Sequence, residues 1–167
     1  DLDIIGVFVH SKINLAIINK LPKLKMIAAR STGFDYIDLI ECKKRGIVVS
    51  NVPEYGENTV AEYTFALILA LSRKIILANN RTHLGTFRLS GLRGIDLQNK
   101  VLGVVGAGNI GKHVIRMAKA FEMQVLVYDV MKNEKLAKRL GFKYVSLNSL
   151  LKRSDIVTLH IPHNKNT

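Results

Sequence analysis

The sequence predicts an α/β protein with doubly wound parallel sheets, and two observations carry that prediction. Short apolar runs rich in β-branched residues alternate with segments of helical periodicity along all 167 residues. In addition, a continuous apolar run at residues 101–105 enters a glycine-rich turn that opens a helical segment. Parallel strands need this order of elements, because each crossover to the next strand usually contains a helix.

The first half of the chain has three predicted strands, at residues 3–10, 24–31 and 46–52. A small helix is expected over residues 38–45, and one long helix over residues 57–79. Asn58 or Thr59 is the predicted N-cap of the long helix, with Glu62 as the capping-box partner of Thr59.

Residues 82–100 are polar, glycine-rich and without periodicity, so they are the predicted crossing between two domains. We therefore expect a first domain over residues 1–90 and a second domain over residues 91–167. In the second domain strands and helices alternate strictly. Strands are expected at 101–105, 124–129, 143–146 and 155–161, and helices at 109–121, 133–141 and 147–154.

Composition and charge exclude several classes of protein. The net charge is +12, but the basic excess is spread along the chain without a recognition motif, so nucleic acid is not an expected partner. The longest apolar stretch, residues 60–77, contains three charged side chains, which predicts a buried helix rather than a membrane span. A single cysteine, Cys42, excludes an internal disulfide and any Cys-rich metal site, which fits a reducing cytoplasm. No histidine spacing suggests a metal site.

The motif that carries chemistry is GAGNIG at residues 106–111, a G-x-G-x-x-G sequence between the predicted strand and helix. Gly106 would permit the tight turn, Gly108 would let backbone amides approach a pyrophosphate, and Gly111 would let the helix pack closely. The next predicted strand ends at Asp129, close to the spacing of about 20 residues expected for an acid that binds the adenosine ribose. These residues predict a Rossmann-like site for NAD, which Asp129 favours over NADP because a carboxylate repels a 2′-phosphate. The alternatives are an ordinary glycine-rich turn and a surface carboxylate.

Three blocks of the sequence occur in a fixed order: ARSTGFDYIDLIECKKRGIVVSNVPEYGENTVAEYTFALILALSR, LQNKVLGVVGAGNIGKHVIRMAKAFEMQVLVYD and SDIVTLHIPHNKNT. Together they resemble the NAD-dependent D-isomer-specific 2-hydroxyacid dehydrogenases, most of all their D-lactate dehydrogenase branch. The resemblance implies hydride transfer between NAD(H) and a small D-2-hydroxy acid or 2-oxo acid, D-lactate and pyruvate first. It also implies that residues 1–90 form a partial, flavodoxin-like substrate domain before a partial Rossmann-like domain at residues 91–167, and that the protein is a homodimer.

The resemblance also assigns candidate site residues one by one. Thr32 and Gly33 match a loop whose backbone amides hold the substrate carboxylate, and Tyr55 matches a tyrosine that reaches the substrate. Besides the three glycines and Asp129, the matched cofactor contacts are Thr64, Asn109, Ile110, Ile161, Pro162 and Thr167. Three alternatives stay open: Gly33 in an ordinary turn, Tyr55 as a surface ring, and Thr64 as a plain helix residue. His160 matches a non-catalytic histidine of the family.

In the family, the catalytic Arg, Glu and His follow the LHIP motif, so the resemblance places them after Thr167. The resemblance also places Asp1 inside the first lobe, without its opening strand. We therefore expect a fragment that lacks both ends and is inactive by itself, in which residues 155–161 form an exposed edge strand prone to aggregation. Relatives that act on phosphoglycerate, glycerate, formate or erythronate-4-phosphate stay open as alternatives. So do a non-catalytic, NAD-sensing, corepressor-like protein on the same fold and another two-lobed NAD protein, such as an adenosylhomocysteinase or alanine dehydrogenase relative.

Overall fold

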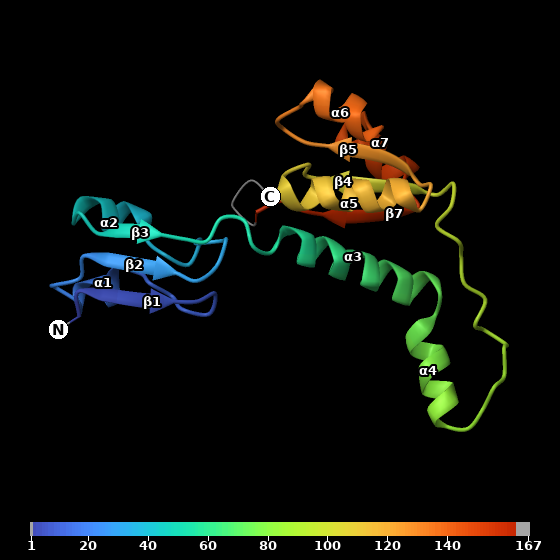
Figure 1. The fold of residues 1–167 in the computed structure, drawn as a ribbon, viewed down its shortest axis with the longest axis horizontal. Coiled ribbons are helices and arrows are strands. Elements are labelled where there is room, and N and C mark those ends of the chain that lie inside the picture. The colour runs from blue at the N-terminus through green and yellow to red at the C-terminus, as the bar shows by residue number, and fades with distance from the viewer. Residues whose placement is uncertain (1, 163–167) are drawn as a thin grey trace. The chain divides into compact units, whose positions relative to one another are not determined.

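The computed structural model describes residues 2–162, and the chain divides into two compact units, Asp1–Gly56 and Glu57–Thr167. Each unit contains parallel strands connected by helices (Figure 1). The predicted α/β class with parallel sheets is therefore confirmed. Among the described residues no helix is both long enough and apolar enough to span a bilayer.

The first unit is built on a three-stranded parallel sheet. The strands are β1 (Ile4–Val7), β2 (Met26–Ala29) and β3 (Val48–Ser50), in the order β1-β2-β3. Two short helices, α1 (Leu15–Asn19) and α2 (Leu39–Lys44), connect them. The core of this unit includes Ile18 from α1, Ile27 from β2 and Cys42 from α2, all almost fully buried. Burial of side chains from each element fixes the helices on the sheet.

The single long helix predicted over residues 57–79 is wrong. The structure has two helices there, α3 (Glu57–Ser72) and α4 (Ile75–His83). Lys74 lies between them with φ 57° and ψ 33°, in the left-handed region. A residue in this conformation cannot continue a right-handed helix, so the chain changes direction at Lys74.

The start of α3 also differs from the prediction. We expected Asn58 or Thr59 as the N-cap, but the helix already begins at Glu57, so both residues lie in its first turn. The Asn58 side-chain amide donates a hydrogen bond to the Glu62 carboxylate. Glu62 therefore bonds to Asn58, whereas the capping box predicted Thr59 as its partner.

The second unit is built on a four-stranded parallel sheet in the order β6-β5-β4-β7. Its strands are β4 (Val101–Val105), β5 (Gln124–Tyr128), β6 (Lys143–Tyr144) and β7 (Ile156–Leu159). Its further helices are α5 (Asn109–Ala120), α6 (Glu134–Leu140) and α7 (Leu147–Arg153). This is the 3-2-1-4 strand order of a Rossmann-type sheet. In such a sheet ligands bind beyond the carboxyl ends of the strands, where the order reverses.

Helix α3 packs on α5 and belongs to the core of the second unit. Phe65 of α3 is buried and stacks on Phe121 with ring centroids 5.3 Å apart. Because of this packing, the compact units divide the chain after Gly56, ahead of the domain boundary predicted after residue 90. The assignment of residues 1–90 to a substrate domain stays a prediction.

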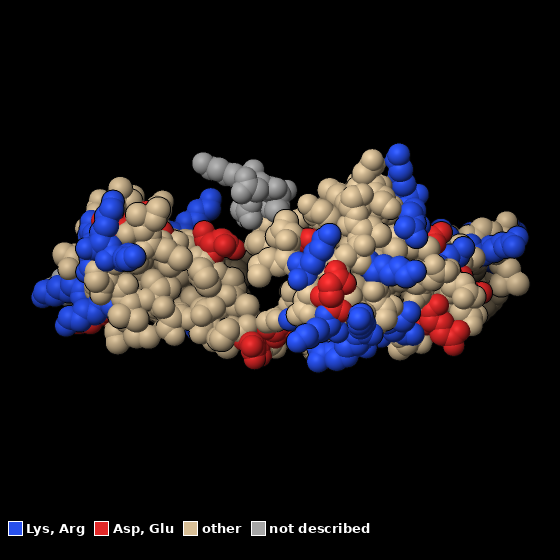
Figure 2. All heavy atoms as spheres, turned by 90° about the horizontal axis from the view of Figure 1, so that it is seen from above, with Lys and Arg blue, Asp and Glu red and all other residues tan. Residues whose placement is uncertain are grey.

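The charged side chains are distributed over both compact units. On the face in Figure 2, Lys and Arg occur on each unit, with Asp and Glu between them. This distribution agrees with the even spread of basic residues along a sequence of net charge +12. A dispersed positive charge attracts small anions weakly and marks no single docking surface.

Candidate functional site

The turn after β4 has no room for side chains at two of its glycines. Gly106 has φ 94°, and a Cβ there would lie 2.6 Å from the carbonyl oxygen of His160. A Cβ on Gly111 would lie 2.1 Å from the carbonyl oxygen of Gly106. Glycine is therefore required at both positions, because a side chain at Gly106 would displace the segment after β7 and one at Gly111 would push α5 away from the turn.

Gly108, the middle glycine of the motif, differs from the other two. It is the N-cap residue of α5, and no atom of residues 2–162 lies within 4 Å of where its Cβ would be. No side chain of the described residues caps the start of this 12-residue helix, so its first N–H groups have no side-chain acceptor among them. Such a helix start favours a bound anion through its free donors and its dipole.

Asp129 lies directly beside this turn. Its Oδ2 accepts a hydrogen bond from the Ala107 backbone N–H at 2.7 Å, and its Oδ1 accepts one from the Met131 N–H at 2.8 Å. The carboxylate is half-buried. β4 and β5 bring it there, because Val105 pairs with Tyr128 at the carboxyl ends of both strands. The acid and the glycine turn predicted from sequence are therefore neighbours.

A hollow of 720 Å³ opens beside the turn and the acid. Five of the predicted cofactor residues line it: Gly106, Gly108, Asp129, Ile161 and Pro162. Sequence reasoning missed other lining residues, among them Lys112, Lys132, Lys135 and Tyr144. The place of Lys132 and Lys135 just after Asp129 was the one signal for them, and lysine in an exposed segment is too common to stand out.

Four of the described cofactor candidates, Thr64, Asn109, Ile110 and Gly111, do not line this hollow. The Asn109 side chain donates a hydrogen bond to Glu57 at 3.3 Å, and Ile110 packs against the core. The side chains of these two residues therefore have partners within the protein. The Thr64 hydroxyl donates to the carbonyl of Val60 in its own helix at 2.8 Å. Thr167 lies outside the described residues.

The predicted substrate loop lies in the first unit, after β2. The Asn51 side chain donates to the Thr32 carbonyl at 2.9 Å, and the Ser31 hydroxyl donates to the Gly33 carbonyl at 2.7 Å. Within residues 2–162, the N–H groups of Thr32 and Gly33 have no hydrogen-bond acceptor. Two free donors on a loop with fixed carbonyls can bind a carboxylate. Tyr55 is 59% exposed and lies in the same unit.

His160 has a structural environment. Its backbone N–H donates to the Val105 carbonyl at 2.8 Å, and its ring Nε2 lies 2.9 Å from the Thr158 hydroxyl. Burial lowers the pKa of His160 from the usual 6.5, so the ring is neutral at pH 7. Among residues 2–162 no group of three His, Cys, Asp or Glu side chains is placed to hold a metal ion.

Comparison with known proteins identifies the family. The model of the D-isomer specific 2-hydroxyacid dehydrogenase, NAD binding domain, matches residues 65–167. The chain belongs to this family. Its cofactor is therefore NAD. The match sets aside the alternative of an adenosylhomocysteinase or alanine dehydrogenase relative.

Solved structures of two relatives are similar over almost the whole chain. D-lactate dehydrogenase from Aquifex aeolicus, solved with NAD and lactic acid, is 44% identical with a TM-score of 0.90, over 98% of this chain and 49% of that chain. An acyclic imino acid reductase, solved with NADPH and D-Arg, is 35% identical with a TM-score of 0.87, over 99% of this chain and 52% of that one.

A curated relative gives the same picture. The glyoxylate reductase of Korarchaeum cryptofilum is 36% identical over 171 residues, which cover all of this chain and 52% of the relative. This chain thus spans about half the length of these relatives. The names of these relatives differ in substrate.

Proposed function

We propose that this chain forms the coenzyme-binding half of an oxidoreductase that transfers a hydride between NAD(H) and a small D-2-hydroxy acid or 2-oxo acid. The observation that carries the proposal is the position of Asp129, hydrogen-bonded to Ala107 of the glycine turn at the edge of an open hollow. In a Rossmann-type site this arrangement lets an acid bind ribose hydroxyls while the turn binds the neighbouring pyrophosphate.

Each residue of the coenzyme site has a role in this proposal. The N–H groups at the start of α5, including those of Asn109 and Ile110, bind the pyrophosphate, and the bare Gly108 lets it approach. Asp129 accepts hydrogen bonds from the ribose hydroxyls. It uses the lone pairs that its two backbone hydrogen bonds leave free. Ile161 and Pro162 flank the adenosine, since both line the hollow. The bound coenzyme supplies or accepts the hydride.

Thr64 and Thr167 are also proposed to contact the coenzyme. The Thr64 hydroxyl already donates to Val60, so it can still accept a hydrogen bond. Its contact is proposed from the family resemblance alone, as is that of Thr167.

The proposed substrate is D-lactate or pyruvate. Thr32 and Gly33 would bind the substrate carboxylate through their two free N–H groups. The exposed Tyr55 would contact the substrate from the loop after Pro53. The similarity to a D-lactate dehydrogenase solved with lactic acid supports this choice. Glyoxylate is the main competitor, because the curated relatives include a glyoxylate reductase.

We further propose that the catalytic Arg, Glu and His belong to a part of the protein beyond these residues, and that the protein is a cytoplasmic homodimer. Large apolar side chains are strongly exposed on α3, on α4 and on the segment that follows: Leu71, Ile76, Leu84 and Phe87. Exposed apolar side chains gathered on consecutive elements mark a surface for a partner, and a second copy is the simplest partner.

The test uses the complete product of the reading frame that encodes this chain. NADH oxidation is followed with pyruvate, glyoxylate, phenylpyruvate and 3-phosphohydroxypyruvate, and NAD reduction with D-lactate and L-lactate. We expect turnover with the 2-oxo acids, fastest with pyruvate, and a preference for D-lactate over L-lactate. NADH binding without turnover of any acid would favour the corepressor-like alternative. The 167-residue chain alone should give no turnover.

A further inference from the structure

We infer that Ser31 and Tyr36 are positioning residues for the substrate carboxylate. Through one chain of hydrogen bonds they hold the loop at Thr32 and Gly33 in the conformation that binds this group. The inference rests on the proposed function, because it concerns the proposed carboxylate loop. It goes beyond that function, since neither side chain is proposed to touch the substrate.

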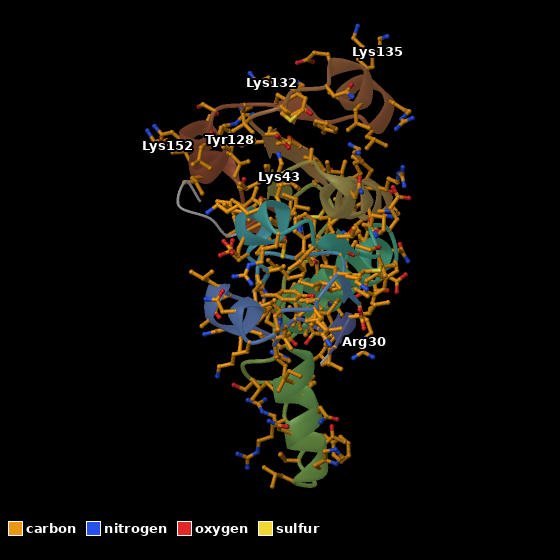
Figure 3. The ribbon with its side chains drawn as sticks, turned by 90° about the vertical axis from the view of Figure 1, so that its left-hand side faces the viewer. Arg30, Lys43, Tyr128, Lys132, Lys135 and Lys152 are labelled. Carbon is orange, nitrogen blue, oxygen red and sulfur yellow. The ribbon has the colours of Figure 1, made fainter. Side chains whose placement is uncertain are left out.

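Ser31 is buried because it continues the pattern of β2. Ile27 and Ala29 of that strand belong to the core of the first unit, and Ser31, two residues further, is 2% exposed. Arg30, just before Ser31, is exposed. Figure 3 shows Arg30 at the edge of this unit, and its guanidinium lies 5.8 Å from the centre of the Phe8 ring. Successive side chains of an extended chain point to opposite faces, so a hydroxyl enters the interior at Ser31 and needs partners there.

The Ser31 hydroxyl has two partners, and their roles can be assigned. Its Oγ donates to the Gly33 carbonyl at 2.7 Å and lies 2.7 Å from the hydroxyl oxygen of Tyr36. A serine hydroxyl carries one proton, which is already used on the Gly33 carbonyl, so Ser31 accepts the proton of Tyr36. The tyrosine therefore donates to the serine, and the serine donates to the loop. Hydrogen bonds in such a chain polarise and strengthen one another.

Each carbonyl of the loop is fixed by a hydrogen bond. The Ser31 carbonyl accepts the Val52 N–H at 3.2 Å, and the Thr32 carbonyl accepts the Asn51 side-chain amide at 2.9 Å. The Gly33 carbonyl accepts the Ser31 hydroxyl. None of the described peptide bonds is cis, so each N–H points opposite to the carbonyl of its own peptide group. The fixed carbonyls therefore direct the N–H groups of Thr32 and Gly33 to the other side of the loop.

Gly33 is the residue of the loop that most needs this restraint, because glycine has more backbone freedom than any other residue. Packing does not require a glycine here. Its φ lies outside the left-handed region, and among residues 2–162 a Cβ would meet only Asp35 Oδ2, at 3.8 Å. Gly33 also lines a hollow of 610 Å³. The bare residue therefore leaves a carboxylate room to reach the N–H groups, and the bond from Ser31 limits the motion that glycine would otherwise allow.

Tyr36 is itself held in place. Its ring packs against the core of the first unit, and its carbonyl accepts the Ile13 N–H at 2.8 Å. The chain of hydrogen bonds therefore begins at a fixed point. Removing the Tyr36 hydroxyl would leave the bond from Ser31 to Gly33 in place but weaker.

The experiment uses the complete product of the reading frame. It measures KM and kcat with pyruvate and with glyoxylate, and the dissociation constant of NADH by fluorescence. Ser31→Ala should raise KM about tenfold for both acids, because the loop binds the carboxylate that they share. The value of kcat should change less than about twofold, since the carboxylate is bound alike in the ground state and the transition state. NADH affinity should not change, because the coenzyme site is in the second unit.

Two further variants and a control make the result specific. Tyr36→Phe is the milder variant and should raise KM about threefold. The double variant Ser31→Ala/Tyr36→Phe should be no worse than Ser31→Ala, because Tyr36 acts through Ser31. Ser72→Ala is the matched control. Ser72 is 7% exposed, its hydroxyl donates to the Leu69 carbonyl of the same helix at 3.4 Å, and it belongs to the second unit, so KM should stay at the wild-type value.

Three outcomes would overturn the inference: a wild-type KM in Ser31→Ala, additive effects in the double variant, and an equal loss of NADH and pyruvate binding in Ser31→Ala. Gly33→Ala separates the inference from the proposed function. If Gly33→Ala raises KM and Ser31→Ala does not, the loop binds the acid without help from Ser31. If neither variant changes KM, the proposed substrate loop is wrong as well. A wild-type protein that turns over no acid would overturn both.

Discussion

The carboxylate of Asp129 accepts a hydrogen bond from the backbone N–H of Ala107 at 2.7 Å. This bond connects the end of β5 to the turn that follows β4, two segments that are neighbours because their strands pair in parallel. The acid and the turn therefore keep a fixed geometry. Their roles can be separated by substitutions that change one and leave the other.

Asp129→Asn should weaken NADH binding about tenfold, because the neutral amide keeps one acceptor oxygen and loses the charge-assisted bonds to the ribose hydroxyls. Fluorescence titration of NADH measures the loss. Asp155→Asn is the matched control, since Asp155 also accepts a backbone N–H, that of Val101 at 2.8 Å, and does not line the hollow. Unchanged NADH affinity in Asp129→Asn would contradict the assignment of the ribose site.

Gly111→Ala should lower the stability of the protein, whereas Gly108→Ala should lower its affinity for NADH. At Gly111 the new Cβ would lie 2.1 Å from a backbone oxygen, so we expect a loss of about 1–3 kcal/mol of unfolding free energy. At Gly108 the new Cβ meets no atom of residues 2–162, so stability should not change. NADH affinity of Gly108→Ala should fall at least about tenfold, because the methyl group occupies the path of the pyrophosphate.

Urea unfolding and NADH titration of both variants check this pair. A stable Gly111→Ala protein would mean that α5 can move away from the turn at little cost. Full NADH affinity in Gly108→Ala would place the pyrophosphate elsewhere.

Lys74→Gly should stabilise the protein by about 1 kcal/mol, because Lys74 has a left-handed conformation that glycine adopts without the steric penalty. The same substitution inside a helix should act in the opposite direction. Lys138→Gly, in the middle of α6, should destabilise by about 1 kcal/mol. Urea unfolding curves measure both changes, and equal signs for the two variants would contradict the break between α3 and α4.

His160 should make stability depend on pH below 6.5. Burial lowers the pKa of this ring in the folded protein, so below 6.5 the unfolded chain binds a proton before the folded protein does. The stability contributed by the neutral ring is complete above pH 6.5 and is lost as the pH falls toward the folded pKa. His160→Gln should remove this part of the pH dependence. Unfolding curves of both proteins on either side of pH 6.5 test it, and identical losses would refute it.

The sequence predicted the parts of the fold that local chemistry determines. The apolar run at β4 was predicted with the bounds that the structure shows, and the helix after it begins at Asn109 as expected. The contact of Asp129 with the turn could also be anticipated, because parallel strands in a Rossmann-type order bring their carboxyl ends together. Both features depend on residues that few other amino acids can replace: the glycines of the turn and the acid at the end of β5.

Other features could not be predicted because their signals are weak. Helix α1 has five residues, too few for a visible period, and its one marker was Asn14, whose side chain accepts the Ile17 N–H at 3.2 Å. The break at Lys74 has no glycine or proline. The sequence does not show that lysines line the hollow, because their position there depends on how the chain folds after β5.

The two backbone hydrogen bonds of Asp129 have a consequence for the thermodynamics of coenzyme binding. They restrict the rotamer of the acid when the protein folds, so its side-chain entropy is already lost before a nucleotide arrives. Association then has no ordering cost at this residue, and the ribose exchanges hydrogen bonds with water for hydrogen bonds with a carboxylate already in place.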